Sequence, residues 1–459
     1  MEDTKAELSE KNNVKLIEKV KNSFKNFFKK NLKMKLLVGY LTINLMYLLI
    51  GSYIFTTGKI INSFHYKEFS YGLKYLFIAN VIVFLVILIH KWRKKDLKCI
   101  KKPIYLGILL CIVFGIISTI FAFDRNIALE GCWGRYEGLF SILYYLTLML
   151  LSTFVSKKYK KFIVNIILVC GLVQVLYSIC QVFNLFNVKQ VFHNKELWIL
   201  GLTKNPNFFG TYMLLCLSYS LGLVIDSKKI KSCIIYGLLS FLFMFGLLTC
   251  NTASAAVGLI FVLIYIFIYC LKNKFYEKFL TVFVIVLSIT CLTVCIKKTT
   301  LVNDVIKIGK EATEVAKGNF DDSFGTKRMF IWKETLKIVP NHLWHGVGID
   351  SFHKAFNGSF LVRFVGTKGK IYDKAHNEYL QTLVTQGIFA LISYMFVYGY
   401  VVYNGTKNAF KNKQIYLVLP VIGYLVQAFF NISTIEVAPI FYMALGLCYE
   451  KKIKSEEQL

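Results

Sequence analysis

The chain has 459 residues, of which 56% are hydrophobic and only 18% charged, and its formal net charge is +29 at pH 7. The apolar residues occur in repeated runs of roughly 18 to 25, the length that a helix needs to cross a ~30 Å hydrocarbon core. These runs exclude an ordinary soluble globular protein. They predict an all-α polytopic membrane protein.

Twelve transmembrane helices are expected in chain order. They lie at about 34–57, 70–89, 103–123, 138–155, 162–185, 207–225, 233–249, 253–271, 279–296, 379–402, 415–431 and 438–449. Helices one to nine thus occupy 34–296, and helices ten to twelve occupy 379–449. One large polar loop, 297–378, separates the two groups. A basic amphipathic segment, 1–33, is expected to lie along the inner membrane surface, and a short tail, 450–459, follows the last span.

The positive charge is distributed unevenly between the two sides of these spans. Residues 1–35 contain ten lysines and 90–102 contain seven Lys and Arg, whereas 250–252 and 432–437 contain none. Lys and Arg gather in cytoplasmic loops, so both termini are predicted to be cytoplasmic and the loop 297–378 extracytoplasmic. The basic excess is then a topology signal with attraction to anionic membrane lipids, and nucleic acid is not an expected partner.

Cysteines give no indication of a metal site. They are scattered, mostly within the spans, with no pair of CxxC repeats, and they are expected to be packing residues. No metal and no cofactor are predicted.

We expect the chemistry to lie in the loop 297–378, because an ordered loop of this length is usually functional. Residues 302–317 and 326–338 are predicted to be short helices, and Pro340 ends the second. A turn is expected at Gly346 and Gly348.

His376 stands where this loop re-enters the membrane, in the segment Ala-His-Asn-Glu-Tyr-Leu at 375–380. A neutral imidazole at the outer interface can serve as a general base near neutral pH. The alternative is a histidine that merely terminates the span. Gly387 is expected to lie inside that span, about 16 Å from His376 along a continuous helix.

Arg328 follows Lys327 in the second loop helix. A guanidinium forks onto phosphate oxygens in a way that lysine cannot, and Lys327 adds positive charge beside it. A solvated loop arginine is the alternative.

Two further outer segments carry polar candidates. Arg135 and Glu137, at the entrance to span four, could contact a lipid headgroup or pair locally. Lys204, Asn205 and Asn207 open span six, where the asparagines could cap the helix or bind a sugar, and capping is the stronger default.

Together these segments resemble the O-antigen ligase and polymerase superfamily of bacterial membrane glycosyltransferases over roughly 100–450. The resemblance rests on Trp-Gly-Arg-Tyr-Glu-Gly at 133–138, Asn-Pro-Asn at 205–207, Arg328 with Trp332, His345-Gly-Val-Gly with Phe352, and the His376 segment with Gly387. The twelve-span layout with its large outer loop also looks like that family.

The resemblance implies a reaction at the outer side of the bacterial cytoplasmic membrane. A glycan would pass from an undecaprenyl-diphosphate carrier to a hydroxyl of a glycan or lipid acceptor, without a metal and with inversion at the anomeric carbon. His376 would be the base and Arg328 the catalytic phosphate contact. The implied substrate-binding residues are Arg135, Glu137, Lys204, Asn205, Asn207, Lys327 and Asn377.

One position departs from the family pattern. Many relatives carry an arginine after the serine of the hairpin between spans seven and eight, whereas here Ser254 is followed by Ala255. Lys204 or Arg135 could replace that phosphate contact. The small residues of the hairpin favour close helix packing.

Two other functions compete with glycan ligation. A polymerase of lipid-linked repeat units shares all the quoted motifs. A transporter or flippase of lipid-linked saccharides is also compatible with twelve spans, but substrate paths are usually marked by intramembrane charges, and Lys74 is nearly alone within these spans. Nor is there the internal repeat that many transporters show.

Overall fold

The computed structural model describes residues 32–53, 63–95, 102–188, 190–193, 196–296, 301–356 and 373–449. The predicted surface segment 1–33 lies almost wholly outside the described residues, and the tail 450–459 lies entirely outside them. Of the loop 297–378, residues 297–300 and 357–372 are not described.

The described chain is almost entirely helical, with one antiparallel strand pair in which Val191 faces Trp198. Besides the first helix, Leu32–Tyr53, the elements are α2 Ser63–Arg93, α3 Pro103–Ile120, α4 Arg125–Glu130, α5 Leu139–Ser152, α6 Lys157–Phe183, η2 Leu185–Asn187, β1 Val191–His193, β2 Glu196–Trp198, α7 Pro206–Asp226, α8 Ile230–Thr249, α9 Ala253–Asn273, α10 Tyr276–Ile296, α11 Leu301–Ala316, α12 Phe324–Ile338, η3 Val339–His342, η4 Phe352–Ala355, α14 Glu378–Gln386, α15 Ile388–Asn412, η6 Ile415–Leu417, α16 Leu419–Ala428 and α17 Ala438–Cys448.

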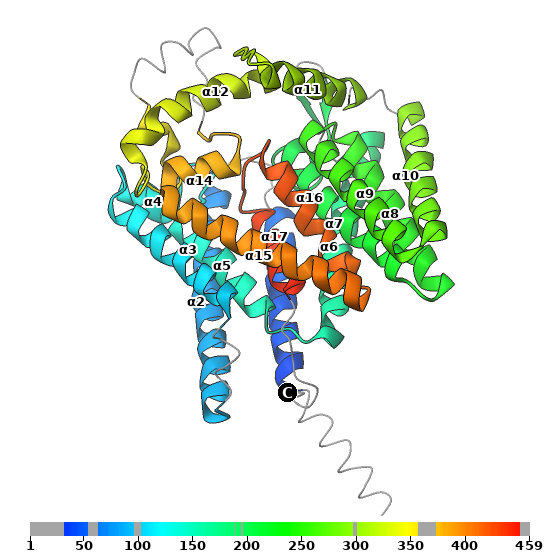
Figure 1. The fold of residues 1–459 in the computed structure, drawn as a ribbon, viewed down its shortest axis with the longest axis horizontal. Coiled ribbons are helices and arrows are strands. Elements are labelled where there is room, and N and C mark those ends of the chain that lie inside the picture. The colour runs from blue at the N-terminus through cyan, green and yellow to red at the C-terminus, as the bar shows by residue number, and fades with distance from the viewer. Residues whose placement is uncertain are drawn as a thin grey trace, which may run out of the picture.

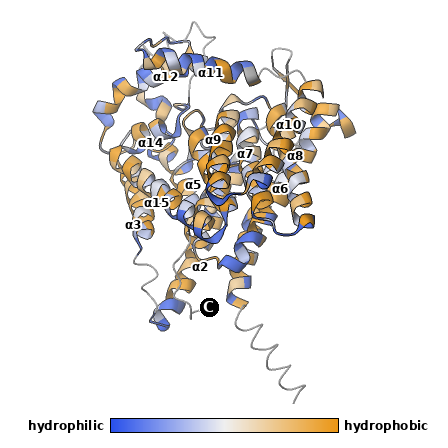
Figure 2. Cartoon of the chain, turned by 45° about the vertical axis from the view of Figure 1, so that its right-hand side comes forward, coloured by the Kyte–Doolittle hydropathy of each residue, from blue (hydrophilic) through white to orange (hydrophobic). Residues whose placement is uncertain are grey.

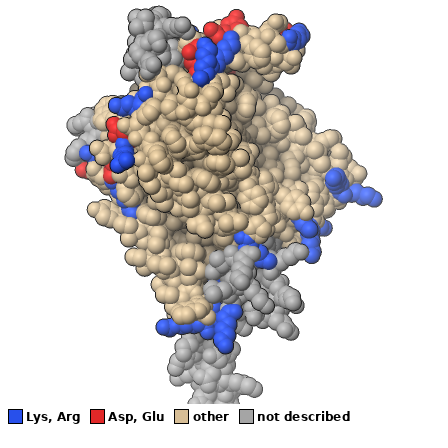
Figure 3. All heavy atoms as spheres, turned by 60° about the vertical axis from the view of Figure 1, so that its left-hand side comes forward, with Lys and Arg blue, Asp and Glu red and all other residues tan. Residues whose placement is uncertain are grey.

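Nine helices of the described chain are long and apolar enough to cross a membrane. On the face shown in Figure 3, charged side chains gather at the two ends of the molecule, and a broad band between them is almost free of charge. This arrangement is that of an all-α polytopic membrane protein, because a hydrocarbon core excludes unpaired charge.

Three of the expected spans coincide with shorter apolar helices, at Leu139–Ser152, Ile415–Ala428 and Ala438–Cys448. A helix of 14 residues is only about 21 Å long, less than the hydrocarbon thickness. Nearly every residue of α5 and every residue of α17 is buried, and the two helices pack against each other. These helices therefore belong to the interior of the bundle, whereas α2 and α10 expose much of their apolar surface.

The described part of the loop 297–378 forms a polar layer over one end of the bundle. Figure 1 shows α11 and α12 lying across this end, with α14 directly beneath α12, and Figure 2 shows α11 and α12 as largely hydrophilic against the apolar bundle. Both helices agree with the two short helices predicted in the loop. The first residues of α12, Gly325 to Lys327, have positive φ, so the regular helix begins at Arg328.

The expected tenth span is interrupted, which corrects the prediction of a continuous helix through Gly387. α14 ends at Gln386, and α15 begins at Ile388 after Gly387 with φ of 87°. A Cβ at Gly387 would stand 2.4 Å from the carbonyl oxygen of Trp344, so only glycine fits this close approach. The break makes α14 a separate short helix, with the His376 segment at its beginning.

Candidate functional site

His376 precedes α14 in an unusual backbone conformation. Its φ is 53°, in the left-handed region that residues with a Cβ seldom adopt and that costs about 1–3 kcal/mol. The next residue, Asn377, is the N-cap of α14, and its side-chain oxygen accepts from the backbone N–H groups of Tyr379 and Leu380, both at 3.0 Å. The cap fixes the direction in which the chain leaves His376.

The residue on the other side of His376 is held from two directions. Trp332 Nε1 donates to the carbonyl oxygen of Ala375 at 3.0 Å, and the N–H of Ala375 donates to Gln381 Oε1 at 2.8 Å. Trp332 follows Arg328 by one helical turn, so both side chains project from the same face of α12. The Trp332 bond therefore brings the Arg328 face of α12 toward the histidine.

The surroundings of His376 favour its neutral form. Burial is the largest cause and the positive charge of Arg328 the second, and together they lower the pKa of His376 to about 4. Arg135 and Lys374 act in the same direction, while Asp373 opposes them. The imidazole is thus uncharged at neutral pH and able to accept a proton.

Arg328 is a largely buried cation with incomplete hydrogen bonding. Its Nε atom is buried and has no hydrogen-bond partner among the described residues, and Nη1 makes only a 3.4 Å contact with the carbonyl oxygen of Gly325. Burial lowers the pKa of Arg328, and Glu311 partly offsets this effect. A buried donor without an acceptor is costly, so this guanidinium is suited to an incoming anion.

Arg135 is already paired within the protein. Its Nε and Nη2 atoms donate to the two carboxylate oxygens of Asp373, at 2.5 and 3.3 Å, and its guanidinium lies 5.8 Å from the centre of the Phe208 ring. Local pairing was one of the two alternatives for this residue. The charges of Arg135 and Asp373 both act on the pKa of His376, so the pair lies within Coulombic reach of the histidine.

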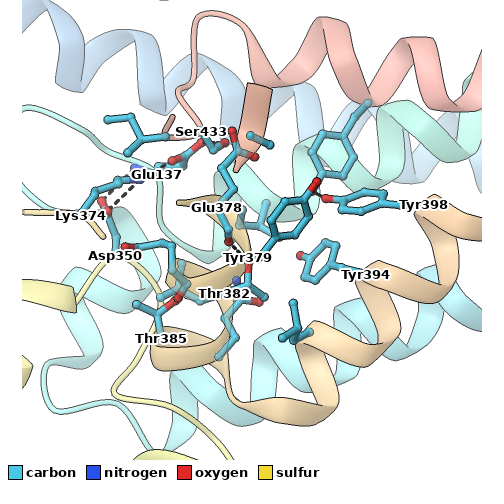
Figure 4. A pocket seen from close by; sticks show the side chains of 18 of the residues that line it. Glu137, Asp350, Lys374, Glu378, Tyr379, Thr382, Thr385, Tyr394, Tyr398 and Ser433 are labelled. Carbon is cyan, nitrogen blue, oxygen red and sulfur yellow. Dashed lines mark hydrogen bonds and ion pairs between the residues drawn. The ribbon is translucent and has the colours of Figure 1, made fainter. Parts of the chain in front are cut away.

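Glu137, the neighbouring candidate, belongs to a buried ion cluster. Lys374 Nζ contacts the carboxylates of both Glu137 and Asp350, the latter at 3.3 Å, and each of the three side chains is at most 4% exposed (Figure 4). Burial alone would lower the pKa of Lys374, but the two carboxylates raise it above its ordinary value. The carboxylate of Glu137 is therefore engaged inside the protein.

The same cluster joins four segments of the chain. Asp350 accepts from the backbone N–H groups of Cys132 at 2.7 Å and Glu137 at 3.3 Å, and Glu137 accepts from Tyr145 at 3.1 Å and Ser433 at 2.5 Å. Networks of this kind, once satisfied, rigidify the structure around them. The cluster fastens the Arg135 segment to the His376 segment.

Lys204 supplies a further cation next to Arg135. Burial lowers the pKa of Lys204 to about 8, with Glu436 opposing and Arg135 contributing to the shift. The hydroxyl of Thr252 donates to the carbonyl of Pro206 at 3.1 Å, so the Lys204 segment adjoins the hairpin that carries Ala255. Ala255 itself is fully buried, and the small residues of this hairpin serve helix packing.

The remaining candidates have other surroundings. Asn205 caps α7 by accepting from the N–H of Asn207 at 2.9 Å, in line with the default expected for the asparagines. Lys327 is exposed, in the positive-φ stretch before Arg328. The structure thus gathers His376, Arg328, Arg135 and Lys204, with Glu137 as an internal partner and Asn205 and Asn377 as caps.

A small cavity lies below the ion cluster, lined by its three members, by Glu378 and by several tyrosines (Figure 4). Its volume is about 60 Å³, which is room for a few water molecules and too little for a sugar. Glu378 accepts from Tyr424 at 2.9 Å, and burial, reinforced by Glu137, raises the pKa of Glu378 to about 8. Neither His376 nor Arg328 lines this cavity, so it is separate from the site that these two residues form.

Sequence reasoning overlooked Asp350, Asp373, Lys374 and Glu378. Asp373, Lys374 and Glu378 adjoin His376 in the sequence, which was a usable signal, but Asp350 lies in a turn without a distinguishing pattern. Among the described residues, no group of three or more His, Cys, Asp and Glu is placed to hold a metal ion.

The fold and the site define a polytopic helical membrane protein. At one end of its helix bundle, a neutral histidine is surrounded by arginine and lysine side chains. Residues 238–395 match the family model described as O-antigen ligase, which confirms the resemblance over this part of the chain. The match includes both His376 and Arg328, whereas Arg135 and Lys204 precede it. No curated protein matches the chain. Together with the apolar helices, the match supports a bacterial membrane protein that is similar to O-antigen ligases and polymerases.

Proposed function

We propose that this protein transfers a glycan from an undecaprenyl-diphosphate carrier to an acceptor hydroxyl at the outer face of the bacterial cytoplasmic membrane. The observation that carries the proposal is the incompletely bonded guanidinium of Arg328 next to the neutral imidazole of His376. Such a transfer requires a cation that binds the leaving diphosphate and a base that accepts the proton of the acceptor hydroxyl.

In the proposed reaction, His376 takes the proton of the acceptor hydroxyl. The acceptor oxygen forms a bond to the anomeric carbon while the bond from that carbon to the diphosphate oxygen breaks, and the electron pair leaves with the diphosphate. Attack from the side opposite the leaving group inverts the anomeric carbon. The imidazole is neutral at the start, as this role demands.

The leaving group gains negative charge in this step, and Arg328 would neutralise it. The guanidinium of Arg328 can fork onto phosphate oxygens, and its burial would strengthen the interaction. Arg135 and Lys204 would form a second phosphate contact in place of the arginine that Ala255 lacks. Their proximity to each other supports this assignment.

The proposed membrane orientation rests on charge. The end of the bundle opposite α11 and α12 shows Lys and Arg without Asp or Glu on the face drawn in Figure 3. This end would be cytoplasmic by the positive-inside rule, with both termini there and the site outside.

A transporter is less well supported than a transferase. Lys74, the main charge within the spans, is paired with Glu130, and its ammonium lies 4.3 Å from the ring centre of Tyr71. Because Lys74 already has these partners within the protein, this one cation gives little support for a substrate path through the membrane.

The decisive experiment is reconstitution of the purified protein with undecaprenyl-diphosphate-linked oligosaccharide and separate glycan and lipid acceptors. Release of undecaprenyl diphosphate together with an extended acceptor is expected. Extension of the carrier-linked glycan itself would indicate the polymerase alternative. Movement of the intact lipid-linked donor across the bilayer, without release of undecaprenyl diphosphate, would refute the proposal in favour of a transporter.

The pH dependence of the reaction follows from the pKa of His376. Only the neutral imidazole accepts a proton, so kcat/KM for the donor should fall as pH drops through the free-protein pKa of His376, about 4, and should be constant above it until the Lys204 ammonium, with a pKa of about 8, begins to lose its charge. A bound diphosphate offsets the positive charge of Arg328, which raises the pKa of His376. The acid limb of kcat is therefore expected at a higher pH than that of kcat/KM. Steady-state rates would be measured between roughly pH 3.5 and 9, the range over which histidine and lysine side chains of this kind titrate. Acid limbs at the same pH in the kcat and kcat/KM profiles would contradict the expectation.

A further inference from the structure

Asp373 is a carboxylate placed between two members of the proposed centre. It binds Arg135 through both oxygens, at 2.5 and 3.3 Å, and it precedes His376 by three residues. Asp373 and His376 also act on each other's pKa, so their charges lie within Coulombic reach. One carboxylate thus binds Arg135 directly and lies within Coulombic reach of His376.

The backbone around Asp373 is held by its neighbours. The next residue, Lys374, is locked into the buried cluster with Glu137 and Asp350, and Ala375 is fixed by Trp332. Since these anchors follow Asp373 directly, its carboxylate is presented from a rigid frame.

The charges that face His376 come from three segments. Arg328 on α12, Arg135 before α5 and Lys374 before α14 are all positive and all disfavour a protonated imidazole. Asp373 is the carboxylate that opposes them. Burial would raise the pKa of Asp373, but Arg135, Lys374 and His376 lower it below its ordinary value, so the carboxylate is ionised at neutral pH.

We propose that Asp373 is a positioning residue for glycan transfer: it holds Arg135 toward the donor diphosphate and stabilises the imidazolium that His376 forms. The inference rests on the function proposed above. The proton passes from the acceptor hydroxyl to the imidazole and stops there, while Asp373 keeps its negative charge and exchanges no proton. Its contribution is electrostatic, because a nearby carboxylate favours the charged form of histidine.

The test is Asp373→Asn, which keeps the shape of the side chain and removes its charge. The kcat is expected to fall about tenfold to a hundredfold, and the acid limb of kcat should move down by about one pH unit or more, because loss of the carboxylate lowers the pKa of His376. Binding of undecaprenyl diphosphate, measured by titration, should weaken by about threefold to tenfold, because Arg135 is no longer held toward the diphosphate while the guanidinium of Arg328 remains.

Asp322→Asn is the matched control, since it makes the same chemical change at an exposed carboxylate of the same loop, one that pairs with Lys333. It should leave both kcat and the acid limb at wild-type values. If the Asp373→Asn protein is not recovered in folded form, Asp373→Ser removes the same charge and carries the same expectations.

An acid limb of kcat that stays at the wild-type pH in the Asp373 variants would overturn the proposal, whether or not kcat falls. A purely structural residue would lower kcat without moving the acid limb. Failure of the underlying function is distinguishable from this result. In that case the wild-type protein itself would release no undecaprenyl diphosphate.

Discussion

Replacing His376 with alanine is expected to lower kcat for glycan transfer by about 10²- to 10⁴-fold, the usual contribution of a positioned general base. The binding of undecaprenyl diphosphate should be kept or slightly tightened, because the phosphate contacts remain. Purified variant and wild-type protein would be compared by release of the carrier and by titration with undecaprenyl diphosphate.

The matched control is His342→Gln, which removes a histidine of the same loop, 297–378, whose ring packs edge-on against Phe123. This variant should retain wild-type kcat. Thermal unfolding of all three proteins in detergent separates loss of chemistry from loss of fold. Transfer at the wild-type rate by the His376 variant would remove this residue as the base.

Arg328→Ala is expected to weaken donor binding and to slow transfer together. A charge-assisted hydrogen bond contributes about 1.5–3 kcal/mol, so the Kd for undecaprenyl diphosphate should rise roughly tenfold to a hundredfold. The kcat should fall as well, because the same guanidinium faces the charge that develops on the leaving group. Arg328→Lys should recover only part of the loss, since an ammonium cannot fork onto two oxygens.

The stability of the unliganded protein provides a second measurement on Arg328. Its Nε atom is buried without a partner among the described residues, so Arg328→Met should leave the thermal midpoint unchanged or raise it. Lys337→Ala, at an exposed cation on the same helix that pairs with Glu334, should change neither Kd nor kcat. A large drop in the thermal midpoint of Arg328→Met, with donor affinity unchanged, would identify a structural arginine instead.

Much of the architecture followed from local patterns in the sequence. Apolar runs and their lengths predicted the membrane class and most helix positions, because hydrocarbon imposes both composition and length on any segment that crosses it. The loop helices α11 and α12 were equally local, since their periodicity and Pro340 fall within short windows. Two departures came from packing: three expected spans are shorter apolar helices, and a close backbone approach at Gly387 divides the tenth.

The sequence by itself also singled out His376 and Arg328, from side-chain chemistry and a resemblance that the family match over 238–395 confirms. Only the tertiary structure could decide which charges are compensated. Lys374 and Glu137 stand 237 positions apart and yet form one buried ion pair, while Arg328 keeps a buried nitrogen without a partner in the described chain. Hydrophobic length and helix caps act between residues a few positions apart, whereas ion pairing and burial depend on how distant segments pack. The pattern of paired and unpaired charge is therefore a property of the folded chain alone.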